Sequence, residues 1–232
     1  MTTGKPHPPS RRAVAAGAAR RRIDMFYPDE GPLRRALYTK HTAYFRGGAK
    51  HRERLFMAGN RVGKTEGVGG YETTLHLTGE YPHWWEGRRF GHAIRAVAAG
   101  DTAKTTRDII QRKLLGPAGD FGSGLIPGAA LLRTTPKAGV PDAVDTVHVR
   151  HVSGGESVLV LRSFDQGRRA FQGDEHHVVW LDEEPPMEVY TEALMRTMTT
   201  DGLVLVTFTP LNGYTELVRH FLDDPDGETV EE

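Results

Sequence analysis

The sequence of 232 residues contains no cysteine. This excludes disulfide frameworks, thiolate zinc sites and cysteine nucleophiles, and it favours a reducing, cytoplasm-like setting. No stretch approaches the roughly 20 apolar residues of a membrane-spanning helix, and the Ala-rich stretch that starts at Ala13 is too short and too weakly apolar for a secretory signal. We therefore expect a soluble, intracellular protein that has no membrane partner.

Net charge is also absent, because 30 Lys and Arg residues balance 30 Asp and Glu residues. The balance hides two charged ends. Residues 1–22 hold six basic residues and no acid, and residues 223–232 hold six acids and no base. The first segment predicts a flexible basic arm, either a solvated tail or a contact for nucleic acid phosphates. The second predicts an acidic tail or a truncation point, which leaves residues 23–222 as the domain.

Between these ends, short β-rich runs alternate with longer helical stretches, a pattern typical of a parallel sheet covered by helices. The sequence thus predicts an α/β fold. The expected strands are residues 54–58, 93–99, 146–152, 157–163, 178–181 and 203–208. The expected helices are residues 38–45, 64–77, 102–115 and 214–222. The Gly- and Pro-rich residues 116–141 are expected to be mostly loop, and Gly154-Gly155 predicts a hairpin.

A Gly-rich turn, AGNRVGKT at residues 58–65, stands between an expected strand and an expected helix. A phosphate-binding loop requires glycine where the backbone approaches phosphate, a lysine for the β and γ phosphates and a hydroxyl for Mg²⁺. Gly63, Lys64 and Thr65 supply these groups, whereas Ala58 stands where the usual pattern has glycine, and a chance turn is the alternative. The residues predicted to bind nucleotide here are Gly59, Asn60, Arg61, Val62, Gly63, Lys64 and Thr65.

Two acids, Asp182 and Glu183, follow the apolar run HVVWL. An enzyme that hydrolyses ATP needs one carboxylate for the metal and a second to activate water, both where a buried strand ends beside the phosphate loop. We predict that Asp182 holds Mg²⁺ together with Thr65, and that Glu183 is the base. Glu184 is expected to be a surface or capping group, and an ordinary acidic strand end is the alternative interpretation of all three residues.

Two further pairs of residues are candidates on weaker grounds. Thr207 and Thr209 end the apolar run LVLVTFT, where they would sense the γ phosphate and pass its loss to a moving helix, although strand propensity explains them equally well. Tyr38 and His41 precede Lys64 by 26 and 23 residues, a spacing that suits contact with the nucleotide base. Packing alone would also explain this second pair.

Five separated segments together resemble the ATPase half of the large terminase subunit of tailed phages, along residues 33–222. They are MAGNRVGKT at 57–65, GEYPHWWEGRRF at 79–90, QGRRAFQG at 166–173, WLDEEPP at 180–186 and TFTP at 207–210. The resemblance implies a RecA-like P-loop NTPase of the additional-strand, catalytic-glutamate type, which uses ATP and Mg²⁺ to drive double-stranded DNA into a procapsid. It also implies that the TFTP segment couples hydrolysis to motion.

The resemblance further implies a portal protein and a small terminase subunit as partners, a ring of copies on the procapsid, and a location in the host cytoplasm and transiently at the portal. The chain stops before the nuclease domain of such subunits, so we expect no DNA cleavage. Relatives often carry arginine where this chain has Asn60 and Gln172. The charge-stabilising arginine is therefore either Arg61 within the subunit, or Arg168 or Arg169 acting on a neighbour.

Two other functions are compatible with the same residues. One is a different RecA-like nucleic-acid motor, such as a helicase. The other is a catalytically silent nucleotide-binding assembly module from a truncated prophage gene.

Overall fold

The computed structural model describes residues 21–223. The expected basic arm and acidic tail lie outside the described residues, apart from Arg21, Arg22 and Asp223 at their inner ends. Arg22 donates to the Glu66 carboxylate at 2.6 Å, which ties the chain to the domain at this point. The rest of the expected division into arm, domain and tail stays a prediction.

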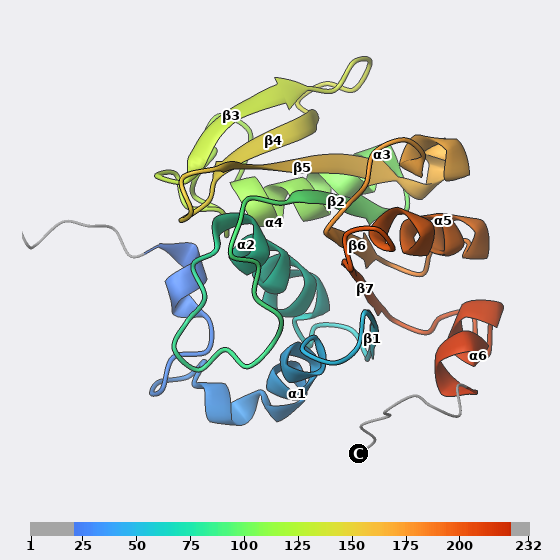
Figure 1. Ribbon diagram of the computed structural model, residues 1–232, viewed down its shortest axis with the longest axis horizontal. Helices are drawn as coiled ribbons and strands as arrows, with labels where there is room; N and C mark the ends of the chain where they lie inside the picture. Colours follow the sequence, from blue (N-terminus) through green and yellow to red (C-terminus); the bar gives the residue numbers. More distant parts are fainter. Residues whose placement is uncertain (1–20, 224–232) are drawn as a thin grey trace, which may run out of the picture.

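A seven-stranded sheet runs through the molecule in the order β1-β7-β6-β2-β5-β4-β3 (Figure 1). The strands are β1 (Glu53–Met57), β2 (Arg95–Gly100), β3 (Leu131–Pro136), β4 (Val144–Arg150), β5 (Glu156–Ser163), β6 (Val178–Asp182) and β7 (Leu203–Phe208). Neighbouring strands from β1 through β7, β6 and β2 to β5 pair in parallel. The pairs β5–β4 and β4–β3 are antiparallel. The expected α/β fold and the expected hairpin, β4 with β5, are therefore confirmed.

Residues 116–141 are mostly loop, as predicted, but they also contain β3, a strand that was not predicted and that pairs with β4. The pairing is irregular, with register shifts between Leu131 and Arg133 and between Thr135 and Pro136. Since β3 lies at the edge of the sheet, one side of the strand needs no partner, and Pro136 can end it without loss of a ladder hydrogen bond.

Helices cover the sheet, and all four expected helices are present. The α-helices are α1 (Thr39–Gly47), α2 (Tyr71–Thr78), α3 (Ala103–Thr105), α4 (Arg112–Leu115), α5 (Met187–Thr197) and α6 (Glu216–Leu222). The π-helical turns η3 (Lys64–Gly70) and η4 (Thr106–Gln111) lead into α2 and α4, and the short 3-10 turns are η1 (Arg22–Met25), η2 (Arg35–Leu37), η5 (Phe164–Gln166) and η6 (Arg168–Phe171). Helix α5 follows Pro185 and Pro186 and was not predicted.

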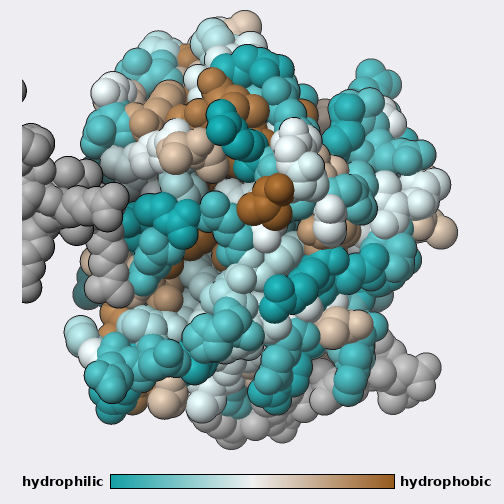
Figure 2. All heavy atoms as spheres, turned by 60° about the vertical axis from the view of Figure 1, so that its left-hand side comes forward, coloured by the Kyte–Doolittle hydropathy of each residue, from teal (hydrophilic) through white to brown (hydrophobic). Residues whose placement is uncertain are grey.

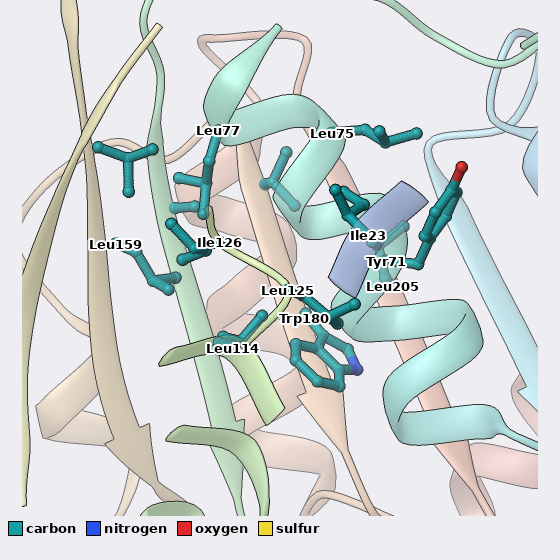
Figure 3. Packing of buried hydrophobic residues seen from close by; sticks show 14 of the residues in the cluster. Ile23, Tyr71, Leu75, Leu77, Leu114, Leu125, Ile126, Leu159, Trp180 and Leu205 are labelled. Carbon is teal, nitrogen blue, oxygen red and sulfur yellow. The ribbon is translucent and has the colours of Figure 1, made fainter. Parts of the chain in front are cut away.

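Alternate residues of the central strands pack into two buried clusters. On β6, Val178 and Trp180 belong to the cluster that includes α2 and α4, and Figure 3 shows this cluster. Val179 and Leu181 belong to the cluster that includes α5 and α6. Full burial of each large apolar side chain contributes about 1.5–3 kcal/mol to stability. Because side chains alternate, Asp182 shares the face of Trp180, which is the face of η3 and α2.

Exposed apolar side chains are spread over different elements. Val152 follows β4, Met198 follows α5 and Leu211 follows β7. On the face in Figure 2, hydrophilic residues cover most of the surface and apolar residues gather in small separate groups. Among residues 21–223, no helix combines the length and the apolar character that crossing a membrane requires.

Strand β7 lies between β1 and β6, so the strand before the phosphate loop and the strand that ends in Asp182 are not neighbours. This is the additional strand that the resemblance implies. The carboxyl ends of β1, β7, β6 and β2 meet at one edge, because these strands are parallel. Ligands of open α/β sheets bind at such an edge.

Candidate active site

The loop of residues 58–65 leaves the carboxyl end of β1 and turns into η3. Its first residue follows β1 directly and is still bound to the neighbouring strand, because the Ala58 amide donates to the Phe208 carbonyl of β7 at 3.3 Å. Ala58 therefore does not need the freedom of the glycine that the usual pattern has there. Gly63 does need it, since its φ of 87° lies in the left-handed region.

Lys64 is the first residue of η3 and is buried. Its Nζ donates to the Gly59 carbonyl at 2.7 Å, so the side chain folds back across the loop. The free amides at the start of a helix and a lysine ammonium beside them together favour the binding of an anion.

Asn60, Arg61 and Val62 form the exposed tip of the loop. Asn60 Oδ1 accepts a hydrogen bond from Thr209 Oγ1 at 3.0 Å, which joins the tip to the segment after β7. Arg61 has a φ of 65°, a left-handed conformation that costs a non-glycine residue about 1–2 kcal/mol. Such backbone strain is concentrated in segments shaped for a ligand.

Thr65 and Asp182 bring the loop and the end of β6 together. Thr65 Oγ1 lies 3.1 Å from Oδ1 and 3.0 Å from Oδ2 of Asp182 and donates to this carboxylate. The two residues are 117 positions apart in the chain. The sequence predicted that these segments meet, and this convergence is confirmed.

Asp182 is only 3% exposed, and burial raises the pKa of its carboxyl group to about 7. Hydrogen bonds from Thr207 and Thr65 oppose this rise. The charge of Glu183 adds to it, and the charge of Lys64 lowers the pKa. A buried carboxylate that ionises reluctantly gains much from a bound cation.

The donor atoms of Thr65 and Asp182 fit Mg²⁺. This ion prefers oxygen ligands and commonly takes one or two from the protein, with the others from phosphates and water. Within residues 21–223 no group of three His, Cys, Asp or Glu side chains could hold a metal.

Glu183 turns away from the strand at the end of β6. Its φ is 84° and its amide donates to the Thr207 carbonyl at 2.8 Å, so the exposed side chain leaves the sheet. It lines a hollow of about 410 Å³ together with Asp101, which follows β2. Desolvation raises the pKa of Glu183, the charge of Lys64 opposes the rise and that of Asp101 adds to it. A carboxylate with a raised pKa beside solvent suits a general base.

Glu184 has different contacts. Its carboxylate accepts hydrogen bonds from Asn212 Nδ2 at 3.2 Å and from Thr215 Oγ1. Thr215 is the N-cap of α6, where its Oγ1 accepts from the Val218 amide at 3.3 Å. Glu184 therefore supports the start of a helix, as expected of a capping group.

The two threonines predicted to sense the γ phosphate have different surroundings. Thr207 is 1% exposed, and its Oγ1 donates to Asp182 Oδ1 at 2.7 Å. Its hydroxyl is thus directed to the Asp182 carboxylate and not toward the open edge. Thr209 donates to Asn60 in the phosphate loop, and sensing by Thr209 through this contact stays a prediction.

His41 and Tyr38 lie beside the phosphate loop. His41 Nδ1 is 2.7 Å from Tyr27 Oη, which donates to the Gly67 carbonyl in η3 at 2.6 Å. Burial lowers the pKa of His41 to about 4, so its ring is neutral, and it also contacts the Val62 backbone. The Tyr38 ring lies 5.2 Å from the His41 ring. The structure gives His41 a role in supporting the loop, and contact of either residue with a base stays a prediction.

The three arginine candidates are not brought together. Arg61 lies in the loop, whereas Arg168 and Arg169 lie in η6, which packs on α5. Arg168 Nε donates to Glu192 Oε2 at 2.7 Å, and this fully buried carboxylate also binds Arg196. Within one chain Arg168 is therefore held at α5, and its action on a neighbouring copy stays a prediction.

Two residues near the site were not singled out from the sequence. Asp101 shares the hollow with Glu183, and Trp180 Nε1 donates to Thr207 Oγ1 at 2.9 Å. A signal existed for each, since Asp101 directly follows an apolar strand and Trp180 stands two residues before Asp182, on the same face.

The raised pKa of Asp182 predicts a pH-dependent effect of Asp182→Asn on stability without Mg²⁺. The folded chain keeps the proton on Asp182 up to about pH 7, whereas the unfolded chain releases it near its ordinary pKa of 3.8. The contribution of this group to stability therefore falls as pH rises between these values. Relative to wild type, the variant should gain about 2–3 kcal/mol in free energy of unfolding between about pH 5 and about pH 8. Urea denaturation at both pH values checks this, and a constant difference would contradict it.

Comparisons with known proteins agree with this geometry. Residues 55–231 match the sequence model of a family described as terminase large subunit, T4likevirus-type, N-terminal. The terminase large subunit of Salmonella phage P22 is 35% identical over 210 residues, which cover 82% of this chain and 42% of the P22 protein. The chain thus spans about two fifths of the length of this relative.

Two solved structures are similar in fold. The large terminase of a thermophilic bacteriophage, in crystal form 2, has a TM-score of 0.58 at 13% identity, covering 79% of this chain and 41% of the phage protein. The same protein in complex with ADP has a TM-score of 0.54 at 15% identity, covering 81% and 42%. These likenesses agree with a RecA-like α/β fold. Because the sequence model matches well over half of the chain, the protein belongs to the terminase large-subunit family.

Proposed function

We propose that this chain is a Mg²⁺-dependent ATPase and the motor domain of a DNA-packaging terminase. The observation that carries the proposal is the hydrogen bond from Thr65 in the phosphate loop to Asp182 at the end of β6. Lys64 directly precedes Thr65 in the sequence, and Glu183 directly follows Asp182. The ADP complex of the large terminase from the thermophilic phage supports a nucleotide as the ligand.

Each of these residues has a distinct task. Lys64 and the amides at the start of η3 would bind the β and γ phosphates, and the ammonium would leave the Gly59 carbonyl to do so. Thr65 and Asp182 would hold Mg²⁺, which supplies positive charge to the phosphate oxygens when bound. Glu183 would orient a water molecule and accept its proton.

A further cation is needed for the charge that develops on the transferred phosphoryl group, and an arginine in this role is worth about 10³–10⁵ in rate. Arg61 would act within the chain from the exposed tip of the loop. Arg168 or Arg169 would act on a neighbouring copy in a ring. Arg168 would first have to separate from Glu192, which it now contacts.

The proposed work of the motor is translocation of double-stranded DNA into a procapsid in the host cytoplasm. Its partners would be the portal protein, the small terminase subunit and further copies of the chain. Contacts with DNA would be made to phosphates, so they would be independent of sequence and weakened by salt.

Two contacts could pass the state of the nucleotide to α6. Thr209 binds Asn60 in the phosphate loop, and Thr215 at the start of α6 binds Glu184 beside the catalytic glutamate. The segment between the two threonines is therefore attached to the site at both ends. A change at the γ phosphate would move one attachment relative to the other.

Phosphate release by the purified chain tests the function. Release that requires Mg²⁺ and rises with duplex DNA of any sequence would support the proposal. Strand separation on a forked duplex would favour the helicase alternative. Binding of ATP with no release in long incubations would favour the silent assembly module.

Thr209→Val should uncouple α6 from the nucleotide. Valine keeps the shape of threonine but removes the hydroxyl that binds Asn60, so nucleotide affinity should change by less than about threefold, since a neutral hydrogen bond contributes little net free energy. In amide hydrogen exchange, ADP should protect α6 in the wild type and in Thr209→Ser, but much less in Thr209→Val. An equal response in all three proteins would show that this contact transmits nothing.

A further inference from the structure

Three side chains on adjacent strands lie on one face of the sheet beside the metal carboxylate. Trp180 and Asp182 are two residues apart on β6, so they point to the same face. Thr207 on β7 is the register partner of Asp182, and it lies directly opposite. This face carries η3, the helical turn that begins with Lys64 and Thr65.

The three side chains form a directed chain of hydrogen bonds. Trp180 Nε1 donates to Thr207 Oγ1 at 2.9 Å, and Thr207 Oγ1 donates to Asp182 Oδ1 at 2.7 Å. An indole nitrogen can only donate, and a hydroxyl has a single hydrogen. Because Thr207 accepts from Trp180, its one proton is left for Asp182. The tryptophan therefore sets the direction in which the threonine donates.

The indole of Trp180 is itself fixed by the phosphate-loop helix. Trp180 is fully buried, and Figure 3 shows its ring next to Leu125. A Cβ atom added to Gly69 would lie 2.1 Å from Trp180 Nε1, and one added to Gly70 would lie 3.6 Å from its ring. A glycine at position 69 is therefore what allows the helix to pack directly on the indole. The ring has little room to rotate away from Thr207.

We propose that Trp180 is a positioning residue for the metal site, which acts through the Thr207 hydroxyl to hold the Asp182 carboxylate in the orientation that binds Mg²⁺. The inference rests on the proposed function, because it concerns the same metal. Thr207 then belongs to the metal site and is not a direct sensor of the γ phosphate. Thr65 donates to the same carboxylate from the loop, so Asp182 is held from two sides.

The experiment compares ADP affinity with Mg²⁺ and with EDTA by calorimetry, and the readout is the ratio of the two dissociation constants. Thr207→Val removes the donor to Asp182 and should reduce this ratio about tenfold, as expected for a hydrogen bond to a charged group. Thr207→Ser keeps the hydroxyl and should retain the wild-type ratio. Trp180→Phe keeps an aromatic side chain but loses the N–H donor together with one ring of the indole, and loss of the neutral hydrogen bond should reduce the ratio about threefold.

Trp85→Phe is the matched control. Trp85 is also buried, and its Nε1 donates to the Arg88 carbonyl at 2.9 Å, remote from the metal site in the contacts it makes. The ratio of the two ADP dissociation constants for Trp85→Phe should equal that of the wild type. In all variants the affinity in EDTA should stay within about twofold, because the phosphate loop is unchanged.

The outcomes separate the inference from the function on which it rests. A wild-type ratio in either Thr207→Val or Trp180→Phe would overturn the positioning role of Trp180 and leave the ATPase proposal intact. An equal loss of affinity with Mg²⁺ and with EDTA would also overturn it, because it would indicate general damage to the loop. If the ADP affinity of the wild-type protein is the same with Mg²⁺ and with EDTA, both the positioning role and the ATPase proposal are overturned. If Trp180→Phe does not fold, equal ratios for valine and serine at position 207 still overturn the inference, because Trp180 is proposed to act only through the Thr207 hydroxyl.

Discussion

Glu183→Gln should lower the rate of ATP hydrolysis by about 10²–10⁴, the usual contribution of a general base. Glutamine keeps the size of the side chain and its place in the hollow at the end of β6, but it cannot accept a proton at neutral pH. Glu183 has a left-handed backbone with φ 84°, and glutamine at this position should keep the same turn of the chain. Single-turnover phosphate release, with protein in excess over ATP, measures the effect even if the wild-type rate is slow.

Nucleotide binding should survive this substitution, because Lys64, Thr65 and Asp182 are unchanged. Glu184→Gln is the matched control, since Glu184 is the next residue but its carboxylate is bound to Asn212 and to the N-cap of α6. Its rate of hydrolysis should stay within a few fold of wild type. A variant Glu183→Gln that hydrolyses ATP normally would mean that another carboxylate takes the proton, and Asp101 in the same hollow would be the next candidate.

The parts of the site that could be predicted are those with a local signal. Gly63 occupies a left-handed position that glycine favours, and Lys64 follows it at a helix start. Asp182 and Glu183 end an apolar strand. Because the ends of parallel strands meet at one edge, the sequence was sufficient to predict that Thr65 and Asp182 lie close together, and their hydrogen bond confirms it.

The parts that could not be predicted depend on which strands are neighbours. Thr207 faces Asp182 only because β7 pairs with β6 in a particular register, and nothing local to either strand encodes that pairing. The sequence therefore could not predict the contact of Thr207 with the Asp182 carboxylate, and sensing of the γ phosphate by Thr207 stays a prediction. The edge strand β3 was missed for a related reason. Proline is rare inside sheets, so Pro136 indicates a loop unless the strand is known to lie at the edge and to pair on one side only.

Helix α5 was missed although its pattern is local. Buried residues recur at Val189, Tyr190, Ala193 and Thr197, which is a helical spacing. The two prolines directly before the helix, however, are typical of a loop. This omission affects the site, because α5 supplies Glu192, which holds Arg168. An arginine that looks free in the sequence is thus engaged in the folded chain.

Lys64→Met should weaken the binding of ADP and ATP about 10- to 100-fold, the loss expected for a charge-assisted hydrogen bond to phosphate. Methionine retains an unbranched chain that can occupy the same buried path across the loop, so the loop should keep its shape. Lys113→Met is the matched control, because Lys113 binds Glu66, the residue after Thr65, and not the loop itself. Titration of fluorescent nucleotide should show a near-normal affinity for the control and a large loss for the variant.

The same substitution should also move the pH dependence of any residual hydrolysis. The charge of Lys64 lowers the pKa of Glu183, so its removal raises that pKa. Because the base works only when ionised, the acid side of the pH–rate profile should shift to higher pH in Lys64→Met and should not shift in Lys113→Met. Weaker binding with an unmoved pH–rate profile would show that the lysine binds phosphate without acting on Glu183. Normal binding with Lys64→Met would exclude the loop as the phosphate site, and the proposed ATPase mechanism with it.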